Sequence, residues 1–303
     1  MKRLGVSVVI PALNEGPHIA EMLEKLKLAF DSSDIEAELI VVDDGSADET
    51  ARMSEEAGAR VFRHPCNIGY GNSVKTGVAN AKHEIIAMID ADGTYPVEVL
   101  PEMVQSLADR NLDMLVGARQ GKIYHGNIIL RIARIFFRML CESATGRSIP
   151  DVNSGMRVIR KDIFTDFWRV LCGGFSITTT ITLVSLLSGR FVAHTPITYF
   201  ARKGKSKIKF KRDVLWTLQL IVRAILLYNP IKAFLALITA MSITGAFMIL
   251  LAIYSAQARF AISLASFFLI AVSIIMAMGF LAEQNGVALP DRTLSMLTKS
   301  EKP

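Results

Sequence analysis

Short apolar runs alternate with segments of helical periodicity over the N-terminal two thirds of the chain. The runs are rich in β-branched residues and stop at proline or small polar residues, which is typical of buried strands. They predict strands at residues 6–10, 39–42, 60–62 and 84–89, and the periodic segments between them predict helices at 19–30, 48–57 and 73–81. Strands and helices alternating at this spacing favour an α/β fold with a mostly parallel sheet.

Acidic residues gather where the predicted strands end. Glu15 follows the first strand, Asp43 and Asp44 follow the second, and Asp90 and Asp92 follow the fourth. Because ligands of open α/β sheets bind at the carboxyl ends of the strands, we expect these side chains to lie around one ligand site.

Two charge-free stretches, Ala233–Tyr254 and Phe260–Ala282, lie near the C-terminus. Each is longer than the ~20 residues that span a bilayer core as a helix. The linker of residues 255–259 has room only for a turn, so the pattern predicts a transmembrane hairpin, the alternative being two helices buried in a soluble core. We therefore expect a globular domain at residues 1–228, followed by a hairpin and tail at 229–303.

Two further segments, residues 127–142 and 211–228, are apolar around most of their circumference. In the first, Arg131, Arg134 and Arg138 form one narrow stripe at 100° per residue. Both segments are predicted to be amphipathic helices lying in the membrane interface with their arginines towards headgroups. The alternative for each is an amphipathic helix packed on the sheet.

Charge and composition narrow the class of protein. The 303 residues are 51% apolar, which excludes disorder, and the net charge of +6 suggests an anionic partner. Three cysteines far apart exclude a disulfide framework and a cysteine zinc site. Lysine and arginine crowd residues 202–232 before the first predicted span, and no signal peptide is expected. The positive-inside rule then predicts an integral protein of the cytoplasmic membrane, with its N-terminal domain and C-terminal tail in the cytoplasm.

The segment Asp90-Ala91-Asp92 is a D-x-D sequence at a strand end, with Gly93 permitting a turn. Two such carboxylates can converge on Mg²⁺ or Mn²⁺, which can bridge the phosphates of a nucleoside diphosphate. In isolation such a pattern is far more often a solvated turn than a metal site.

Four segments carry a resemblance to a known family. They read VSVVIPALNE at 6–15, VVDDGSADET at 41–50, NIGYGNSVKTG at 67–77 and DADGTYP at 90–96. In order and spacing they resemble the family 2 glycosyltransferases, which implies the GT-A fold, a Rossmann-like nucleotide-sugar-binding domain.

Two later segments resemble a narrower group. They are DVNSGMR at 151–157 and RKGKSK at 202–207, and they are similar to motifs of the polyprenyl-phosphate glycosyltransferases, such as dolichol-phosphate mannose synthases and bacterial undecaprenyl-phosphate hexosyltransferases. The resemblance implies inverting, metal-dependent transfer of one hexose from a UDP- or GDP-hexose to a polyprenyl phosphate at the cytoplasmic membrane face.

The resemblance also implies roles for single residues, carried over position by position. Those implied for the nucleotide sugar are Pro11, Leu13, Glu15, Asp43, Asp90, Ala91 and Asp92, with Asp90 and Asp92 also the metal ligands. Those implied for the acceptor phosphate are Arg119, Arg131, Arg202, Ser206 and Lys207. The catalytic set would be Asp92, Arg119 and Arg202.

The sequence departs from the family pattern in two places. Thr94 stands where mannose synthases have a metal-binding glutamine, so the third metal ligand is open. The basic loop is one residue shorter than in the family, which makes the assignment of Lys207 less secure than that of Arg202.

The segment 174–182 contains no acidic residue, although relatives often carry a catalytic base there. A phosphate monoester, whose second pKa is about 6, is already largely ionised at neutral pH and needs no strong base. Such an acceptor instead needs cations that bring it together with the anionic donor, and the basic loop 202–212 is predicted to supply them. The alternative is that the charges of this loop serve only to orient the protein in the membrane.

Other classes of protein fit less well. A polysaccharide-elongating synthase would be expected to carry a Gln-x-x-Arg-Trp signature, which is absent, and to have more than two spans. A non-catalytic nucleotide- or lipid-binding scaffold would not need the Asp90/Asp92 pair. Nucleic acid is disfavoured because no aromatic platform interleaves the basic residues. The sequence leaves open the identity of the sugar, the base of the nucleotide, the length of the polyprenol and whether the protein forms a homo-oligomer.

Overall fold

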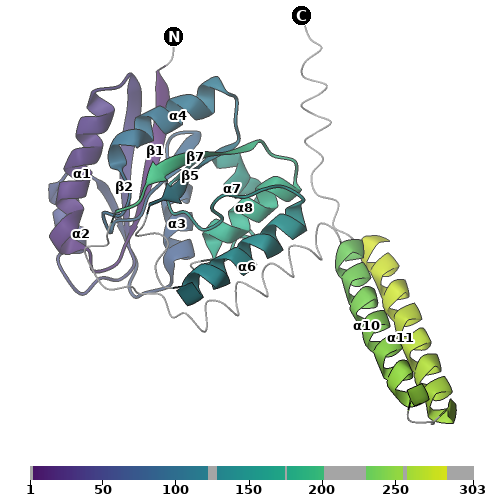
Figure 1. Ribbon diagram of the computed structural model, residues 1–303. Helices are drawn as coiled ribbons and strands as arrows, with labels where there is room; N and C mark the ends of the chain where they lie inside the picture. Colours follow the sequence, from purple (N-terminus) through teal and green to yellow (C-terminus); the bar gives the residue numbers. More distant parts are fainter. Residues whose placement is uncertain (1–2, 122–127, 175, 201–229, 255–257, 285–303) are drawn as a thin grey trace, which may run out of the picture. The chain divides into compact units, whose positions relative to one another are not determined.

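The computed structural model describes residues 3–121, 128–174, 176–200, 230–254 and 258–284 (Figure 1). The chain divides into two compact units, Met1–Ile221 and Val222–Pro303, and each is described by itself. The predicted segment 211–228, the residues Arg202, Ser206 and Lys207, and the tail lie outside the described residues.

A seven-stranded sheet with the order β3-β2-β1-β4-β6-β5-β7 forms the centre of the first unit. Its strands are β1 (Leu4–Ala12), β2 (Ile35–Asp43), β3 (Arg60–Arg63), β4 (Ile85–Met88), β5 (Met114–Gln120), β6 (Arg157–Arg160) and β7 (Val192–Thr198). Every neighbouring pair is parallel except those of β6, which runs antiparallel to both β4 and β5. The predicted mostly parallel α/β sheet is thereby confirmed.

Helices cover both faces of the sheet. They are α1 (Gly16–Asp31), α2 (Thr50–Glu56), α3 (Tyr70–Ala79), the 3₁₀ turn η1 (Val97–Val99), α4 (Leu100–Asp109), α6 (Ile128–Thr145), α7 (Lys161–Phe167) and α8 (Ile177–Leu187). The predicted helices correspond to α1, α2 and α3. The third begins three residues earlier than predicted, directly after Gly69, whose φ of 108° turns the chain into it.

The alternation of side chains along β1 explains the layers. Val8 and Ile10 are fully buried in a cluster that includes Ile19 and Leu23 of α1. Val9 points the other way, and a Cβ on Gly77 of α3 would lie 2.4 Å from its Cγ1. Both faces of a central parallel strand are covered, which is why β1 reads as a continuous apolar run.

The reversed strand β6 positions the loop that precedes it. Arg157, the first residue of β6, pairs with Met88, the last residue of β4. The segment 151–156 therefore lies next to the residues that follow β4, at the carboxyl edge of the sheet. The amide of Gly117 in β5 donates to the carbonyl of Met156 at 3.0 Å and holds this segment from the other side.

The second unit contains α10 (Pro230–Tyr254) and α11 (Ala258–Gln284), which enclose the predicted stretches 233–254 and 260–282. They pack antiparallel, because a Cβ on Gly245 would meet Phe268 and one on Gly279 would meet Phe234. Within the described residues one stretch, Ile262–Gly279, is long and apolar enough to cross a membrane, and Leu237–Leu251 is a shorter apolar stretch. A transmembrane hairpin stays a prediction.

Candidate functional site

Hydrogen bonds join the loop after β1 to the loop after β2. The amide of Asn14 donates to Ser46 Oγ at 2.9 Å, and Asn14 Oδ1 accepts from the amide of Ala47 at 2.8 Å. The next amide, of Glu15, donates to Thr50 Oγ1 at 2.9 Å. Asn14 adopts a positive φ of 49°, which asparagine tolerates better than most residues. These contacts hold Leu13 and Glu15 beside the end of β2.

Asp43 is fully buried at the end of β2. Its Oδ1 accepts from the amide of Ser46 at 2.8 Å, whereas Oδ2 accepts no hydrogen bond within the described residues and lies 3.3 Å from Arg63 Nε. A cavity of about 370 Å³ is lined here by Gly45, Ser46, Arg63, His64 and Pro65. A buried carboxylate oxygen that has an ion-pair partner but accepts no hydrogen bond still has capacity for a ligand N–H or O–H group.

Asp44, the second acid of the doublet, holds the chain that leads into α3. Its Oδ1 lies 2.8 Å from His64 Nδ1 and accepts from the amide of Ile68 at 3.0 Å. Its Oδ2 accepts from the amide of Gly69 at 2.9 Å. Sequence reasoning placed Asp44 at the strand end but assigned no role to it or to His64, since their pairing spans 20 residues.

The glycines at 69 and 71 allow the start of α3 to approach the segment 172–174. A Cβ on Gly69 would lie 2.7 Å from the carbonyl oxygen of Gly173, and one on Gly71 would lie 2.4 Å from that of Cys172. The Gly-x-Gly element therefore serves close backbone packing, which fixes the first residue of α3, Tyr70.

The turn after β4 presents the two acids of the D-x-D sequence. Asp92 is 8% exposed, and its Oδ1 accepts from the amide and the hydroxyl of Thr94 at 3.1 and 2.6 Å. Asp90 is half-buried, and its Oδ1 accepts from the hydroxyl of Tyr70 at 2.7 Å. Gly93 makes the turn with a φ of 69°. Thr94 thus contacts a predicted metal ligand, a role that sequence reasoning did not foresee.

The donor chemistry at this turn suits a divalent cation bound together with a substrate. The described part of the chain contains no group of three or more His, Cys, Asp or Glu side chains that could hold a metal alone. Mg²⁺ is usually held by one or two carboxylates plus substrate phosphates, and Asp90 and Asp92 provide such a pair. Their role as metal ligands stays a prediction.

Partly buried Arg119 and buried Asp151 form an ion pair that sequence reasoning missed. Arg119 Nε and Nη2 donate to the carboxylate of Asp151 at 2.7 and 2.9 Å, and the backbone amide of Arg119 donates at 3.1 Å. The guanidinium also lies 5.4 Å from the ring centroid of Tyr199. Burial works to raise the pKa of Asp151, but the hydrogen bonds and charge of Arg119 hold that pKa below its usual value. Asp151 is therefore a weak base.

This ion pair predicts an acid-sensitive fold. A carboxyl group with a lowered folded-state pKa stabilises the protein above its unfolded pKa, ordinarily 3.8, and that stabilisation is lost as the pH falls through the folded value. Asp151→Asn should lower the free energy of unfolding at neutral pH by about 3 kcal/mol, since it leaves Arg119 without its anion. Urea unfolding of both proteins from about pH 7 down to about pH 1, which includes the range in which such a contribution is lost, should show a shallower acid decline for the variant. Parallel curves would contradict the prediction.

Arg157 anchors the segment before β6. It is fully buried, and burial lowers its pKa to about 10. Its guanidinium donates to the carbonyl of Ser154, and to the carbonyl of Thr178 and the hydroxyl of Thr182 at 3.1 Å each. The last residue of the DVNSGMR segment therefore ties the 151–156 loop to α8, which contains no acidic residue.

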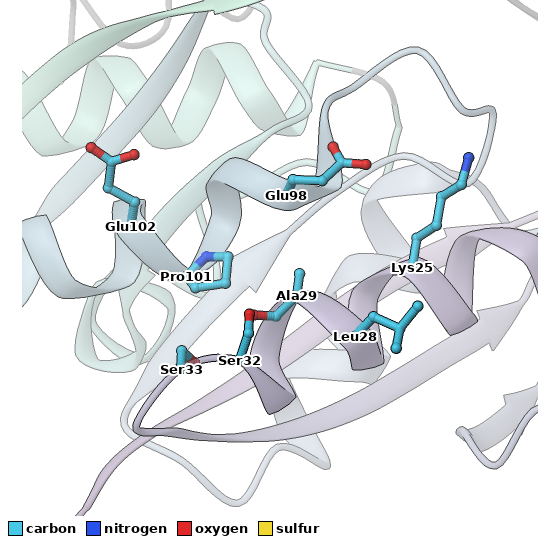
Figure 2. Close-up of a pocket in the computed structure, with 8 residues that line it drawn as sticks. All are labelled: Lys25, Leu28, Ala29, Ser32, Ser33, Glu98, Pro101 and Glu102. Atoms are coloured by element: carbon cyan, nitrogen blue, oxygen red, sulfur yellow. The ribbon is translucent and has the colours of Figure 1, made fainter.

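A larger groove lies elsewhere, between α1 and the start of α4 (Figure 2). It encloses about 510 Å³ and is lined by Lys25, Leu28, Ala29, Ser32, Ser33, Glu98, Pro101 and Glu102. None of the predicted site residues is among them, so the groove does not mark the site.

The fold is similar to that of solved glycosyltransferase structures. Glucosyl-3-phosphoglycerate synthase from Mycobacterium tuberculosis, in complex with Mn²⁺, UDP-glucose and phosphoglyceric acid, matches with a TM-score of 0.60 and 18% identity, over 74% of this chain and 80% of that one. The same enzyme with Mg²⁺ and UDP matches with a TM-score of 0.61 and 20% identity, over 73% and 79%. The likeness shows the GT-A fold that the resemblance implied.

Curated relatives match over about two thirds of the chain. The low-salt glycan biosynthesis hexosyltransferase Agl6 of Haloferax volcanii is 29% identical over 219 residues, which cover 67% of this chain and 50% of the relative. The undecaprenyl-phosphate 4-deoxy-4-formamido-L-arabinose transferase of Klebsiella pneumoniae is 28% identical over 214 residues, which cover 68% and 63%. The matched part of the chain thus spans only half to somewhat under two thirds of each relative.

The family model for glycosyl transferase family 2 matches residues 7–168, more than half of the chain, and this range includes Asp43, Asp90 and Asp92. This protein therefore belongs to glycosyl transferase family 2.

Proposed function

We propose that the protein is an inverting, metal-dependent hexosyltransferase that moves one hexose from a nucleoside diphosphate sugar to a polyprenyl phosphate at the cytoplasmic membrane face. The proposal rests on the placement of three acids. Buried Asp43 ends β2 and the Asp90/Asp92 turn follows β4, and these two strands flank β1, so the acids lie at the carboxyl ends of neighbouring strands. A relative named for transfer to undecaprenyl phosphate supports the acceptor class.

The nucleoside would bind at the end of β2. Asp43 Oδ2 is buried, is ion-paired with Arg63 and accepts no hydrogen bond within the described residues, so it has capacity for an N–H group of the nucleobase. Pro11, Leu13 and Glu15 follow one another at the end of neighbouring β1 and would complete the nucleoside site.

The diphosphate would lie beside the turn after β4, where Asp90 and Asp92 would hold Mg²⁺ or Mn²⁺. When bound, such an ion neutralises the charge that develops on the departing diphosphate. Tyr70 and Thr94 donate hydrogen bonds to these carboxylates and keep them oriented. The solved neighbours that contain Mn²⁺ or Mg²⁺ with UDP support the cofactor class.

The acceptor would be an ionised phosphate that needs no strong base. No acidic residue occurs in α8, and Asp151 is held as a weak base by Arg119. Arg119, Arg131, Arg202, Ser206 and Lys207 are the proposed acceptor-phosphate contacts, and of these the structure describes Arg119 in its ion pair and Arg131 as exposed on α6.

Helix α6 supports contact with the membrane interface. Ile135, Phe136 and Met139 are 42%, 62% and 58% exposed on one stripe of the helix, and buried Cys141 and Ala144 lie on the opposite side. At 100° per residue, one flank of the helix between its exposed and buried sides carries Arg131, Arg134 and Arg138. An exposed apolar stripe bordered by arginines is typical of a helix that lies in the headgroup region.

The exposed stripe predicts lipid binding by the chain without its hairpin. Residues 1–228 should co-float with anionic vesicles, and replacing Phe136 and Met139 together by serine should weaken binding at least about tenfold, since each buried apolar side chain contributes roughly 1.5–3 kcal/mol. Leu28→Ser is the matched control, because Leu28 is 70% exposed on α1. Protein that stays free of vesicles would show that the interfacial prediction is wrong.

The test of the proposed function is incubation of membranes containing the protein with a panel of labelled nucleotide sugars and undecaprenyl phosphate. A labelled monosaccharide-lipid, released by mild acid, is the expected product. Label in a growing polymer would favour a polysaccharide synthase instead. Nucleotide binding without transfer to any acceptor would favour a non-catalytic scaffold.

A further inference from the structure

We infer that Tyr70 and Gly155 are positioning residues that hold the carboxylate of Asp90 in place for the divalent cation. The inference rests on the proposed function, in which Asp90 is a metal ligand. Neither residue was predicted from the sequence to belong to the site.

Tyr70 reaches Asp90 from α3. Its hydroxyl donates to Asp90 Oδ1 at 2.7 Å, across 20 residues of sequence. Tyr70 is the first residue of α3, and the preceding amide of Gly69 is held by Asp44 Oδ2 at 2.9 Å. The neighbouring Gly71 packs against the backbone of 172–174, so the helix start cannot shift freely. The tyrosine hydroxyl is thus presented to Asp90 from a fixed point.

Gly155 closes the other side of the same carboxylate. A Cβ at this position would lie 2.3 Å from Asp90 Oδ2 and 2.6 Å from Asp90 Cγ, closer than any real contact. The backbone here is held as well, because the amide of Gly155 donates to the hydroxyl of Tyr95 at 2.7 Å and the next carbonyl, of Met156, accepts from Gly117. Only glycine lets the loop before β6 lie against Asp90.

The hydroxyl of Tyr70 and the backbone at Gly155 together restrict the Asp90 side chain to one rotamer. Asp90 and Asp92 are like charges on one turn, and their repulsion favours rotamers that point apart when no cation is bound. A hydroxyl donor on one side and backbone on the other oppose that rotation. Partners that orient a metal ligand typically change metal affinity 10- to 100-fold when removed.

The test is Mn²⁺ binding by the full chain in detergent with saturating UDP, followed by electron paramagnetic resonance of free Mn²⁺. Tyr70→Phe should weaken Mn²⁺ binding about tenfold. Its UDP affinity in chelator and its melting temperature should change little. The matched control is Ser73→Ala, which removes a buried hydroxyl of the same helix whose partner is the carbonyl of Gly69. It should bind Mn²⁺ like the wild type.

Gly155→Ala should weaken Mn²⁺ binding by at least as much, because the added methyl displaces the Asp90 carboxylate. A double-mutant cycle assigns the effect: in an Asp90→Asn background, Tyr70→Phe should have no further effect on Mn²⁺ affinity. Wild-type Mn²⁺ affinity in Tyr70→Phe, or an equal loss in both backgrounds, would overturn the inference and leave the proposed function standing. A wild-type protein that binds UDP but no Mn²⁺ would overturn both.

Discussion

Asp92→Asn is expected to abolish hexose transfer and to remove the metal-dependent part of donor binding. Asp92 is buried, and its Oδ1 accepts two hydrogen bonds from Thr94 that an asparagine Oδ1 can also accept. The variant should therefore fold and lose only the negative charge. If that charge holds the cation that neutralises the departing diphosphate, several kcal/mol of stabilisation disappear, a loss of about 1000-fold or more in turnover.

The prediction is tested by initial rates at saturating donor and acceptor, which give the turnover, and by the melting temperature, which shows whether the variant is folded. Excess chelator should reduce the wild type to the level of the variant, and added Mn²⁺ or Mg²⁺ should restore only the wild type. Asp109→Asn is the matched control, since it removes a carboxylate on α4 whose contact is the exposed Gln105. Full wild-type activity in excess chelator would contradict a metal-dependent reaction.

The sequence predicts the strands of the first half of the sheet because their cause is local. β1, β2 and β4 are buried on both faces, so their apolar runs are visible without any knowledge of their neighbours. The direction of β6 is not local. Four residues, Arg157–Arg160, with a fully buried arginine at their start, carry no signal of an antiparallel strand, and that direction depends on pairing with β4 and β5.

The candidate site divides in the same way. Asp43, Asp90 and Asp92 are recognisable because they lie at or shortly after the ends of strands, and the fold places those strand ends together. The partners of these acids come from distant segments. Tyr70 lies 20 residues from Asp90, and Arg119 lies 32 residues from Asp151, so neither contact leaves a pattern in the sequence. Only the fold shows which polar groups orient the acids and which neutralise them.

Arg202→Ala and Asp151→Asn are expected to differ in turnover, and the difference tests whether the enzyme uses a carboxylate base. Arg202 is the proposed permanent cation where the anionic donor and acceptor meet. Each charge-assisted phosphate contact contributes roughly 1.5–3 kcal/mol, so Arg202→Ala should cost about 10- to 150-fold in turnover. Asp151→Asn should cost less, because Asp151 is bound to Arg119 by three hydrogen bonds and its lowered pKa makes it a poor proton acceptor.

Both variants must be measured at saturating donor and acceptor, since Asp151→Asn also weakens the fold. Asparagine keeps an oxygen that can accept a hydrogen bond from Arg119, so the guanidinium should stay near its place. Any loss of turnover is then due to the lost negative charge.

A true general base contributes about 10²–10⁴-fold, a loss that we do not expect from a carboxylate already ion-paired with Arg119. With an ionised phosphate acceptor, the acid limb of the rate should follow acceptor ionisation at a pKa of about 6–7 in both variants. If Asp151→Asn folds, binds both substrates and still loses more turnover than Arg202→Ala, Asp151 acts as a general base. The absence of an acidic residue from α8 would then no longer argue for an acceptor that is already ionised.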